Sequence, residues 1–255
     1  MSSYFGLHAQ LYDSIYADKP YEKEVGFIHS CLKKYSSYKI TDILELACGT
    51  GNHSFELEKF GYKLKALDYS PDMLDQARLK AQRFNSKVKF MLMDMRDLPI
   101  FKKKFDSTIC LFDSLGYVLT NDAIRKVLQG VHKNLKKNGL FIFDFWYAPA
   151  MIEHFDPLRT RTFRHKGLTF IRTSETSLDL FSQIATVYYV INEIGKKGQV
   201  PQFKETQKNR FFLIQEMTLF LTTSGFQVLK YFDGCSDKEN IDDKSFHVLA
   251  VAQKI

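Results

Sequence analysis

The chain has 255 residues, which is long enough to bury a large apolar core and excludes the short scaffolds that depend on a metal ion or on disulfides. Hydrophobic residues make up 45% of the chain and charged residues 25%, and with 23 Phe and 13 Tyr it is too aromatic to be disordered. The formal net charge of +7 favours an anionic partner, without distinguishing a polynucleotide from a small phosphate ester.

No segment is suited to crossing a membrane, because the longest apolar candidate, residues 140–152, is interrupted by Asp144 and Pro149. Residues 1–19 contain Tyr, His and Asp where a signal peptide needs a basic start and an apolar run. The four cysteines are scattered without a Cys-x-x-Cys pair, so neither a disulfide framework nor a zinc site is indicated. We therefore expect a cytoplasmic protein with reduced thiols and no metal ion.

From residue 22 to about residue 148, buried strands alternate with amphipathic helices. This order is typical of a parallel sheet that is covered by helices on both faces. The predicted strands are 42–47, 63–68, 88–93, 105–112 and 140–145.

Two of the helices between these strands have clear boundaries in the sequence. One is predicted over 71–84, with Ser70 as its N-cap and Pro71 in its first turn. The other is predicted over 122–135 and ends at the Lys-Lys-Asn-Gly sequence of residues 136–139.

Beyond Pro149 the hydrophobic pattern changes to a period of two residues, which predicts antiparallel hairpins rather than further β-α-β units. The stretches with this pattern are 168–173, 182–191 and 202–212. A helix is predicted next, over 213–223.

Two further strands are predicted at 226–232 and 246–252. Because this pair cannot bury both of its faces by itself, we expect it to rejoin the first sheet. The predicted organisation is a core of residues 1–149 and 213–255, with an inserted antiparallel sheet at 150–212.

The first predicted strand leads into a glycine turn and then into a helix. Gly49 and Gly51 permit a positive φ and let a ligand lie against bare backbone, which suits an adenosine-type cofactor. A dinucleotide-binding fingerprint would have a third glycine where Ser54 stands, so NAD is the less favoured ligand.

Two carboxylates end the next predicted strands. Asp68 ends the second strand, where a carboxylate can accept hydrogen bonds from both ribose hydroxyls of a nucleoside, and Asp94 ends the third. Each residue alone is explained as a helix cap, and the glycine pair alone as a tight turn. Because all three features lie at the carboxyl ends of neighbouring strands, together they predict a ligand-binding edge.

These residues resemble the motifs of class I S-adenosylmethionine-dependent methyltransferases. Glu45-x-x-Cys48-Gly49-x-Gly51 is similar to their first motif, and Asp68-Tyr69-Ser70-Pro71-Asp72-Met73-Leu74 to their acidic loop and the helix after it. The resemblance covers residues 40–145 and implies a Rossmann-like seven-stranded, mostly parallel α/β sheet with S-adenosylmethionine as cofactor. It implies that Glu45 and the backbone of the glycine turn hold the methionine end, Asp68 the ribose, and Asp94 with Met95 the adenine. The full set of cofactor residues that it implies in this part of the chain is Glu45, Ala47, Gly49, Gly51, Asp68, Tyr69, Met73, Asp94 and Met95.

A narrower resemblance is to the N,N-dimethyltransferases that act on nucleotide-linked amino sugars, and glycine N-methyltransferases share part of the same plan. It rests on the inserted sheet and on four segments, Tyr4, Leu11-Tyr12-Asp13, Asp113-Ser114-Leu115-Gly116-Tyr117 and Trp146-Tyr147-x-Pro149. It implies that Tyr4 lines the amine site and that Tyr12 contacts the methionine end of the cofactor. Members of this family can have a histidine at the position of Tyr117, and this chain does not, which leaves the proton acceptor open.

Tyr4 and Tyr117 are the candidate catalytic residues. Because a sulfonium is already activated, such an enzyme has to hold a neutral amine in line with the methyl group and exclude water. A phenol with an ordinary pKa near ~10 suits a hydrogen bond that orients the amine better than it suits proton abstraction. An aromatic wall residue is the alternative interpretation of Tyr117.

The candidate acceptor-binding residues follow the fifth predicted strand. Trp146 and Tyr147 could flank a sugar ring or the sulfonium, or pack in the core instead. Arg161 and Arg164 belong to the densest basic segment, residues 159–166, and arginine forks suit a diphosphate. A solvated basic loop is the alternative for this segment.

The sequence thus predicts an S-adenosylmethionine-dependent methyltransferase of a small molecule, with N-methylation of an amino sugar on a nucleoside diphosphate as the first hypothesis. O- or N-methylation of another small metabolite is the alternative, because the same fold supports both. An RNA methyltransferase is less favoured, since the chain has no appended RNA-binding domain and no Asn-Pro-Pro-Tyr motif. A cofactor-binding regulator without catalysis and the formation of a homodimer are left open.

Overall fold

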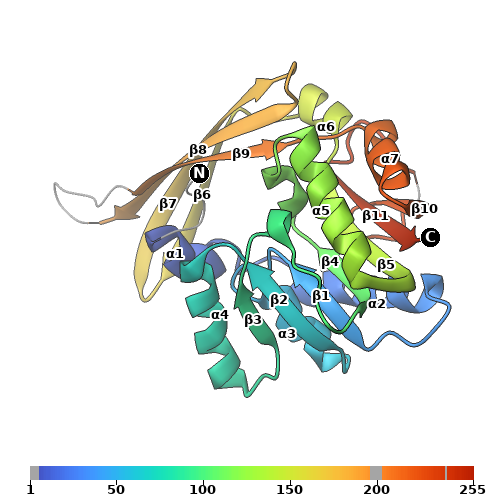
Figure 1. Ribbon diagram of the computed structural model, residues 1–255. Coiled ribbons are helices and arrows are strands. Elements are labelled where there is room, and N and C mark those ends of the chain that lie inside the picture. Colours follow the sequence, from blue (N-terminus) through green and yellow to red (C-terminus); the bar gives the residue numbers. More distant parts are fainter. Residues whose placement is uncertain (1–5, 196–202, 239) are drawn as a thin grey trace.

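The computed structural model describes residues 6–195, 203–238 and 240–255, which form two β-sheets with helices packed on them (Figure 1). The larger sheet has seven strands in the order β10-β11-β5-β4-β1-β2-β3. Their bounds are β1 Asp42–Leu46, β2 Lys63–Asp68, β3 Lys89–Leu92, β4 Phe105–Cys110, β5 Leu135–Trp146, β10 Phe226–Asp233 and β11 His247–Lys254. The strands from β5 to β3 run parallel, whereas β11 is antiparallel to both β5 and β10. The predicted seven-stranded, mostly parallel sheet is therefore confirmed, as is the return of the last two strands to it.

Helices cover both faces of this sheet. The helices are α1 Leu7–Ile15, α2 Tyr21–Tyr35, α3 Asn52–Lys59, α4 Pro71–Phe84, α5 Asn121–Asn134, α6 Ala148–Glu153 and α7 Ile214–Thr223, with the short 3-10 turns η1 Met95–Asp97 and η2 Ser114–Tyr117. Ile28 of α2, Phe55 of α3 and Leu74 of α4 belong to one core cluster, and Leu128 of α5 and Phe220 of α7 belong to the other. Within the described parts of the chain, no helix has the length and apolarity needed to cross a lipid bilayer.

The boundaries of β5 differ from the prediction. The strand begins at Leu135, not at residue 140, so the Lys-Lys-Asn-Gly segment that was expected to end a helix lies inside a strand. Asn138 has a positive φ of 59°, and the pairing of β5 with β4 shifts register near this point. The strand has a β-bulge here, and a bulge favours residues such as Asn and Gly, which also occur where helices end. The segment was therefore interpreted as a helix end.

The second sheet consists of four antiparallel strands in the order β6-β7-β8-β9. Their bounds are β6 Leu158–His165, β7 Leu168–Asp179, β8 Ile184–Ile194 and β9 Phe203–Arg210. The strand β6 was not predicted, because among its residues only Phe163 is buried. Charged residues on a short edge strand protect it from pairing with other chains. The same residues leave the strand without the alternating apolar pattern by which a strand is predicted. The assignment of residues 150–212 to a separate inserted domain stays a prediction.

The second sheet contacts the rest of the fold at several points. The helix α1 lies beside β6 (Figure 1), and its Leu11 and Ile15 pack against Phe163 of that strand. The strand β9 lies so close to η2 that a Cβ on Gly116 would be 1.9 Å from Oδ1 of Asn209. Gly116 therefore permits the close approach of β9 to the core.

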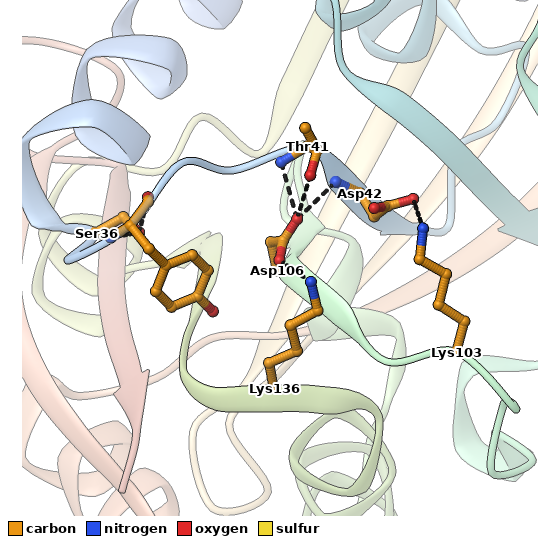
Figure 2. Close-up of polar contacts among 7 residues, drawn as sticks. Ser36, Thr41, Asp42, Lys103, Asp106 and Lys136 are labelled. Carbon is orange, nitrogen blue, oxygen red and sulfur yellow. Dashed lines mark hydrogen bonds and ion pairs between the residues drawn. The ribbon is translucent and has the colours of Figure 1, made fainter.

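Asp106 of β4 joins the central strands at the end of the sheet opposite to the glycine turn (Figure 2). Its Oδ2 accepts hydrogen bonds from N–H and Oγ1 of Thr41, both at 2.9 Å, and from N–H of Asp42 at 2.8 Å. Lys136 of β5 donates to its Oδ1. These bonds tie the start of β1 to β4 and β5, and they fix the strand that leads into the glycine turn.

Candidate functional site

The glycine turn between β1 and α3 has the backbone conformation that its sequence predicts. Gly49 has a φ of 56° and Gly51 a φ of 80°, a region that glycine enters without strain. Asp68 accepts a hydrogen bond at 2.8 Å from N–H of Gly49 and, with its other oxygen, one at 2.8 Å from N–H of Ser70. The structure therefore brings the glycine turn and Asp68 together at one edge of the sheet.

A cavity of about 460 Å³ lies at the carboxyl ends of β1, β2 and β3. The predicted cofactor residues that line it are Ala47, Asp68, Tyr69, Asp94 and Met95. Asp68 is only 6% exposed, and burial raises the pKa of its carboxyl, against the opposing effect of the hydrogen bonds from Ser70 and Gly49. A buried carboxyl in a cavity wall suits a diol, because the hydroxyls supply the donors that water no longer provides.

Asp94 is already paired within the protein. Its carboxylate accepts hydrogen bonds from the backbone N–H and the guanidinium of Arg96, at 2.8 and 2.9 Å. Burial alone would raise the pKa of Asp94, but the bonds from Arg96 outweigh it and leave the pKa below its ordinary value. Arg96 also lines the cavity. Arg96 was not predicted, because Asp94 was interpreted only as a contact to the ligand.

A smaller cavity adjoins the first, with Ala47 in the walls of both. The predicted residues that line it are Tyr12, Glu45, Ala47 and Gly49. Glu45 is 2% exposed and accepts a hydrogen bond from the hydroxyl of Ser54, the residue that stands in place of a third glycine. Burial raises the pKa of Glu45 to about 8, so a cationic group is the ligand that would keep this carboxyl ionised.

Together these two cavities present groups that suit S-adenosylmethionine. Asp68 in the larger one would suit a ribose, and the buried carboxyl of Glu45 in the smaller one would suit the cationic amino-acid end. The smaller cavity has a volume of about 30 Å³, so it has to widen to admit that end. Gly49 lines the smaller cavity with a φ that other residues rarely adopt, so the backbone itself forms part of the wall.

Two predicted cofactor residues lie behind the cavity walls instead. A Cβ on Gly51 would be 2.9 Å from the ring of Phe90, and the N–H of Gly51 is used by the carbonyl of Cys48 at 2.9 Å. Gly51 thus serves packing and the turn. Met73 is 3% exposed and packs with Tyr12 under the glycine turn. Neither residue lines the two cavities, and their assignment as cofactor contacts stays a prediction.

A third cavity, of about 490 Å³, lies between the second sheet and the core. Tyr117 lines both this cavity and the 460 Å³ cavity, so it stands where the two meet. Trp146 lines the third cavity as predicted. Tyr4 lies outside the described residues.

Tyr147 does not line the third cavity. It follows Trp146 at the end of β5, and successive side chains of an extended chain point to opposite sides. Tyr147 accordingly packs against the core cluster that contains Phe212, and its N–H donates to the carbonyl of Phe246 at 3.0 Å. Tyr147 therefore packs in the core, whereas Trp146 packs against the cluster that contains Phe211 and also lines the third cavity.

The predicted arginines lie outside the third cavity. Arg164 is exposed on the face of β6 opposite to Phe163, and Arg161 pairs with Asp18 at 2.9 Å. The arginines that line the cavity are Arg159 and Arg172. The assignment of Arg161 and Arg164 to the acceptor stays a prediction.

Two residues that were not predicted as site residues, His247 and Asp113, pair in the wall of this cavity. The Nδ1 atom of His247 lies 2.8 Å from Oδ2 of Asp113, and the N–H of Asp113 donates to Asp144 at 2.9 Å. The charge of Asp113 raises the pKa of His247 to about 9, so the imidazole is cationic at neutral pH. Burial raises the pKa of Asp144 to about 7. Asp113 belongs to the segment after β4, but no local signal links it to a histidine so far along the chain.

Comparison with known proteins agrees with this geometry. Residues 43–139 match the family model described as a methyltransferase domain. A protein of Bacillus subtilis (strain 168), named as a methyltransferase without a substrate, is 28% identical over 231 residues, 91% of this chain and 90% of its own length. The dTDP-3-amino-3,6-dideoxy-alpha-D-glucopyranose N,N-dimethyltransferase of Streptomyces fradiae is 26% identical over 232 residues, 89% of this chain and 86% of that one. The structure of an S-adenosylmethionine-dependent methyltransferase from Clostridium acetobutylicum ATCC 824 superimposes with a TM-score of 0.82 at 23% identity, covering 96% of this chain and 97% of that one.

Proposed function

We propose that this chain, an S-adenosylmethionine-dependent methyltransferase with the class I fold, methylates the amino nitrogen of a sugar that is carried on a nucleoside diphosphate. The observation that supports this most directly is the position of Tyr117, which lines both the cofactor cavity and the cavity under the second sheet. A small acceptor in the third cavity, which we call the acceptor cavity, would therefore reach the methyl donor past Tyr117. The similarity to amino-sugar N,N-dimethyltransferases extends over most of the chain and supports the same acceptor class.

The charges of the third cavity favour a phosphorylated acceptor. Its walls contain Arg159, Arg172 and the cationic His247 together with the carboxyls of Asp113 and Asp156. Arg159 lies 3.6 Å from Asp156 and His247 lies 2.8 Å from Asp113, so Arg172 is the cation of this wall that we assign first to a phosphate. Arg172 is held by the hydroxyl of Tyr16 at 3.2 Å and lies over the ring of Tyr189, at 5.1 Å from its centroid. A guanidinium that is fixed in this way loses little side-chain entropy when it binds an anion.

Aromatic residues form another part of the walls of this cavity and suit flat or ring-shaped groups. Trp146, Phe155 and Tyr189 all line it. Rings of this kind stack on sugars and bases and exclude water from the reacting amine. A neutral amine held there in line with the methyl group needs no strong base, because S-adenosylmethionine supplies a methyl group that is already activated on a sulfonium.

Methyl transfer to a purified acceptor tests this proposal. We expect the protein to add 14 or 28 mass units to dTDP-3-amino-3,6-dideoxy-α-D-glucopyranose, the acceptor in the name of the Streptomyces fradiae relative, when S-adenosylmethionine is present. The matched control is dTDP-glucose, which has the same nucleotide and no amine. Methylation of glycine or of dTDP-glucose, with none of the amino sugar, would support the alternative of another small metabolite. We place this activity in the cytoplasm and expect no nucleic-acid partner.

A further inference from the structure

A chain of buried polar side chains connects Tyr117 to the N-terminal helix. The hydroxyl of Tyr117 lies 3.3 Å from Oε1 of Gln207, Nε2 of Gln207 lies 2.7 Å from Oε1 of Glu205, and Oε2 of Glu205 lies 2.8 Å from Nδ1 of His8. Gln207, Glu205 and His8 are 3%, 7% and 0% exposed. Three elements, η2, β9 and α1, thus contribute to one hydrogen-bonded array beside the acceptor cavity.

The chemistry of these groups fixes the direction of each hydrogen bond. A carboxylate accepts hydrogen bonds and donates none, so His8 and Gln207 both have to donate to Glu205. With its NH₂ group used in this way, the amide of Gln207 presents its carbonyl oxygen to Tyr117. A carbonyl oxygen only accepts, so the phenol of Tyr117 has to donate its proton to Gln207.

This direction decides what the Tyr117 oxygen can do at the junction of the two cavities. A hydroxyl has a single proton, so every other hydrogen bond at this oxygen is one that it accepts. An amine that donates an N–H to the oxygen keeps its lone pair available for the methyl group. A phenol that donated its proton to the amine would instead occupy that lone pair and block the transfer.

We propose that His8, Glu205 and Gln207 are positioning residues that hold the Tyr117 hydroxyl as a hydrogen-bond acceptor, and that the site thereby selects acceptors with an N–H to donate. This inference rests on the proposed amine methylation. A primary amine has two such hydrogens and a singly methylated amine has one, whereas a doubly methylated neutral amine has none. The array therefore supports two methyl transfers to one nitrogen and disfavours a third.

The burial of this array argues against a role in packing alone. Each buried polar group costs stability unless it is fully hydrogen-bonded, and apolar residues of the same shape would fill the space at a lower cost. The close contact of β9 with the core is made separately, by Gly116 and Asn209. Gln207 itself lines the acceptor cavity, which is where a polar group that directs Tyr117 is needed.

A double-mutant cycle with dTDP-3-amino-3,6-dideoxy-α-D-glucopyranose tests the array. We expect Gln207→Leu and Tyr117→Phe each to lower kcat about tenfold, the scale of one lost hydrogen bond in the transition state, with the KM for S-adenosylmethionine unchanged. The double variant should lose no more than Tyr117→Phe alone, because Gln207 acts through the phenol. In Gln207→Leu the second methylation should fall more than the first, since a single N–H then remains to be oriented.

The matched control is Thr218→Val, which removes the hydrogen bond at 2.9 Å to another tyrosine hydroxyl, that of Tyr231. Neither Thr218 nor Tyr231 is in the walls of the cofactor and acceptor cavities, so its kcat and its ratio of products should match the wild type. If Gln207→Leu does not fold, Glu205→Gln keeps the shape of the array and frees the amide of Gln207 to turn, and we expect about a threefold loss of kcat with the same shift in products.

The outcomes separate this inference from the proposed function. A wild-type protein that methylates no amino sugar would overturn both. An active wild type in which the losses from Gln207→Leu and Tyr117→Phe add up in the double variant would overturn the array alone. Addition of a third methyl group by the wild type would also contradict it.

Discussion

The cofactor edge, which is the glycine turn with the Asp68 and Asp94 ends of β2 and β3, differs in construction from the acceptor cavity. Tyr117 lines the cavities of both regions. At the cofactor edge, side chains are held by backbone groups nearby in the sequence or on the adjoining strand, as Asp68 is held by Gly49 and Ser70. In the acceptor cavity, the contacts join distant segments. His247 meets Asp113 across 134 residues of sequence, and Tyr117 meets Gln207 across 90.

This difference has a consequence for how each region responds to substitution. A change at the cofactor edge removes bonds that shape the turn itself, so its effect is expected in cofactor affinity. A change in the acceptor cavity alters how two parts of the fold meet, so its effect is expected in stability, in the KM of the acceptor or in kcat, and not in cofactor affinity. The following substitutions test whether the two regions separate in this way.

The largest effect is expected from Asp68→Ala at the cofactor edge. The substitution leaves the N–H groups of Gly49 and Ser70 without their acceptor and removes the group that we assign to the ribose. Unpaired buried groups of this kind cost roughly 1–3 kcal/mol, so the Kd for S-adenosylmethionine should rise about fivefold to 150-fold. Titration calorimetry measures this change.

The matched control for that experiment is Asp75→Ala, since the Asp75 side chain is 64% exposed on α4 and pairs with Arg78 at 3.1 Å. Its Kd for S-adenosylmethionine should equal that of the wild type. An equal loss of affinity in both variants would mean that the charge of this region acts as a whole and not through Asp68.

The next effect is expected from Gly116→Ala, where the second sheet meets the core. The added Cβ would lie 1.9 Å from Oδ1 of Asn209 and 2.8 Å from the carbonyl of Arg210, so β9 has to move away from η2. Overpacking of this kind destabilises a protein by about 1–3 kcal/mol, and denaturant unfolding measures it. The acceptor KM should rise as well, whereas the Kd of S-adenosylmethionine should change little.

Gly26→Ala is the matched control, because no heavy atom lies within 4 Å of the added Cβ and the residue is inside α2. Alanine favours a helix over glycine, so this variant should be as stable as the wild type or more so. A similar loss of stability in both variants would show that β9 does not depend on the close approach at Gly116.

The sequence predicted the cofactor edge well because its signals are local. A glycine turn after a buried strand and aspartates at the ends of the next two strands fall into register in any parallel sheet, which places Gly49, Asp68 and Asp94 together. Gly51 and Met73 do not line the cavities, since a motif gives the position of a residue and not the direction in which its side chain points.

The acceptor cavity was predicted only in outline, for a physical reason. Which arginine of a strand faces a cavity depends on its pairing, and β6 is an edge strand without an apolar alternation that would reveal its inner face. Arg159 and Arg172 were therefore missed although they lie in or beside the predicted basic segment. The pair of His247 and Asp113 exists only because β11 returns beside β5, which no local pattern indicates.

A smaller effect is expected from two arginines of the second sheet, Arg172 inside the acceptor cavity and Arg164 outside it. Arg172→Ala should raise the KM of dTDP-3-amino-3,6-dideoxy-α-D-glucopyranose about tenfold, because a phosphate contact far from the amine contributes to binding without changing kcat. Arg164→Ala removes an arginine that is exposed outside the cavity, so steady-state kinetics should show no change for it. Equal KM values for both variants would remove the diphosphate from the proposed acceptor.

The smallest effect is a pH dependence at the cofactor edge. Burial raises the pKa of Glu45 to about 8, so below this pH the empty site has a protonated carboxyl, which has to lose its proton before it can pair with the cationic end of S-adenosylmethionine. Cofactor affinity should then increase about fivefold between pH 7 and pH 8 through this group alone. The ratio of the Kd of Glu45→Gln to that of the wild type isolates this contribution, because the titration of the cofactor itself affects both proteins equally. Calorimetry at several pH values should show this ratio rising with pH and levelling off above pH 9. A ratio that stays constant from pH 6.5 to pH 9 would show that Glu45 does not meet the cationic end, and the methionine moiety would then have to be held elsewhere in the smaller cavity.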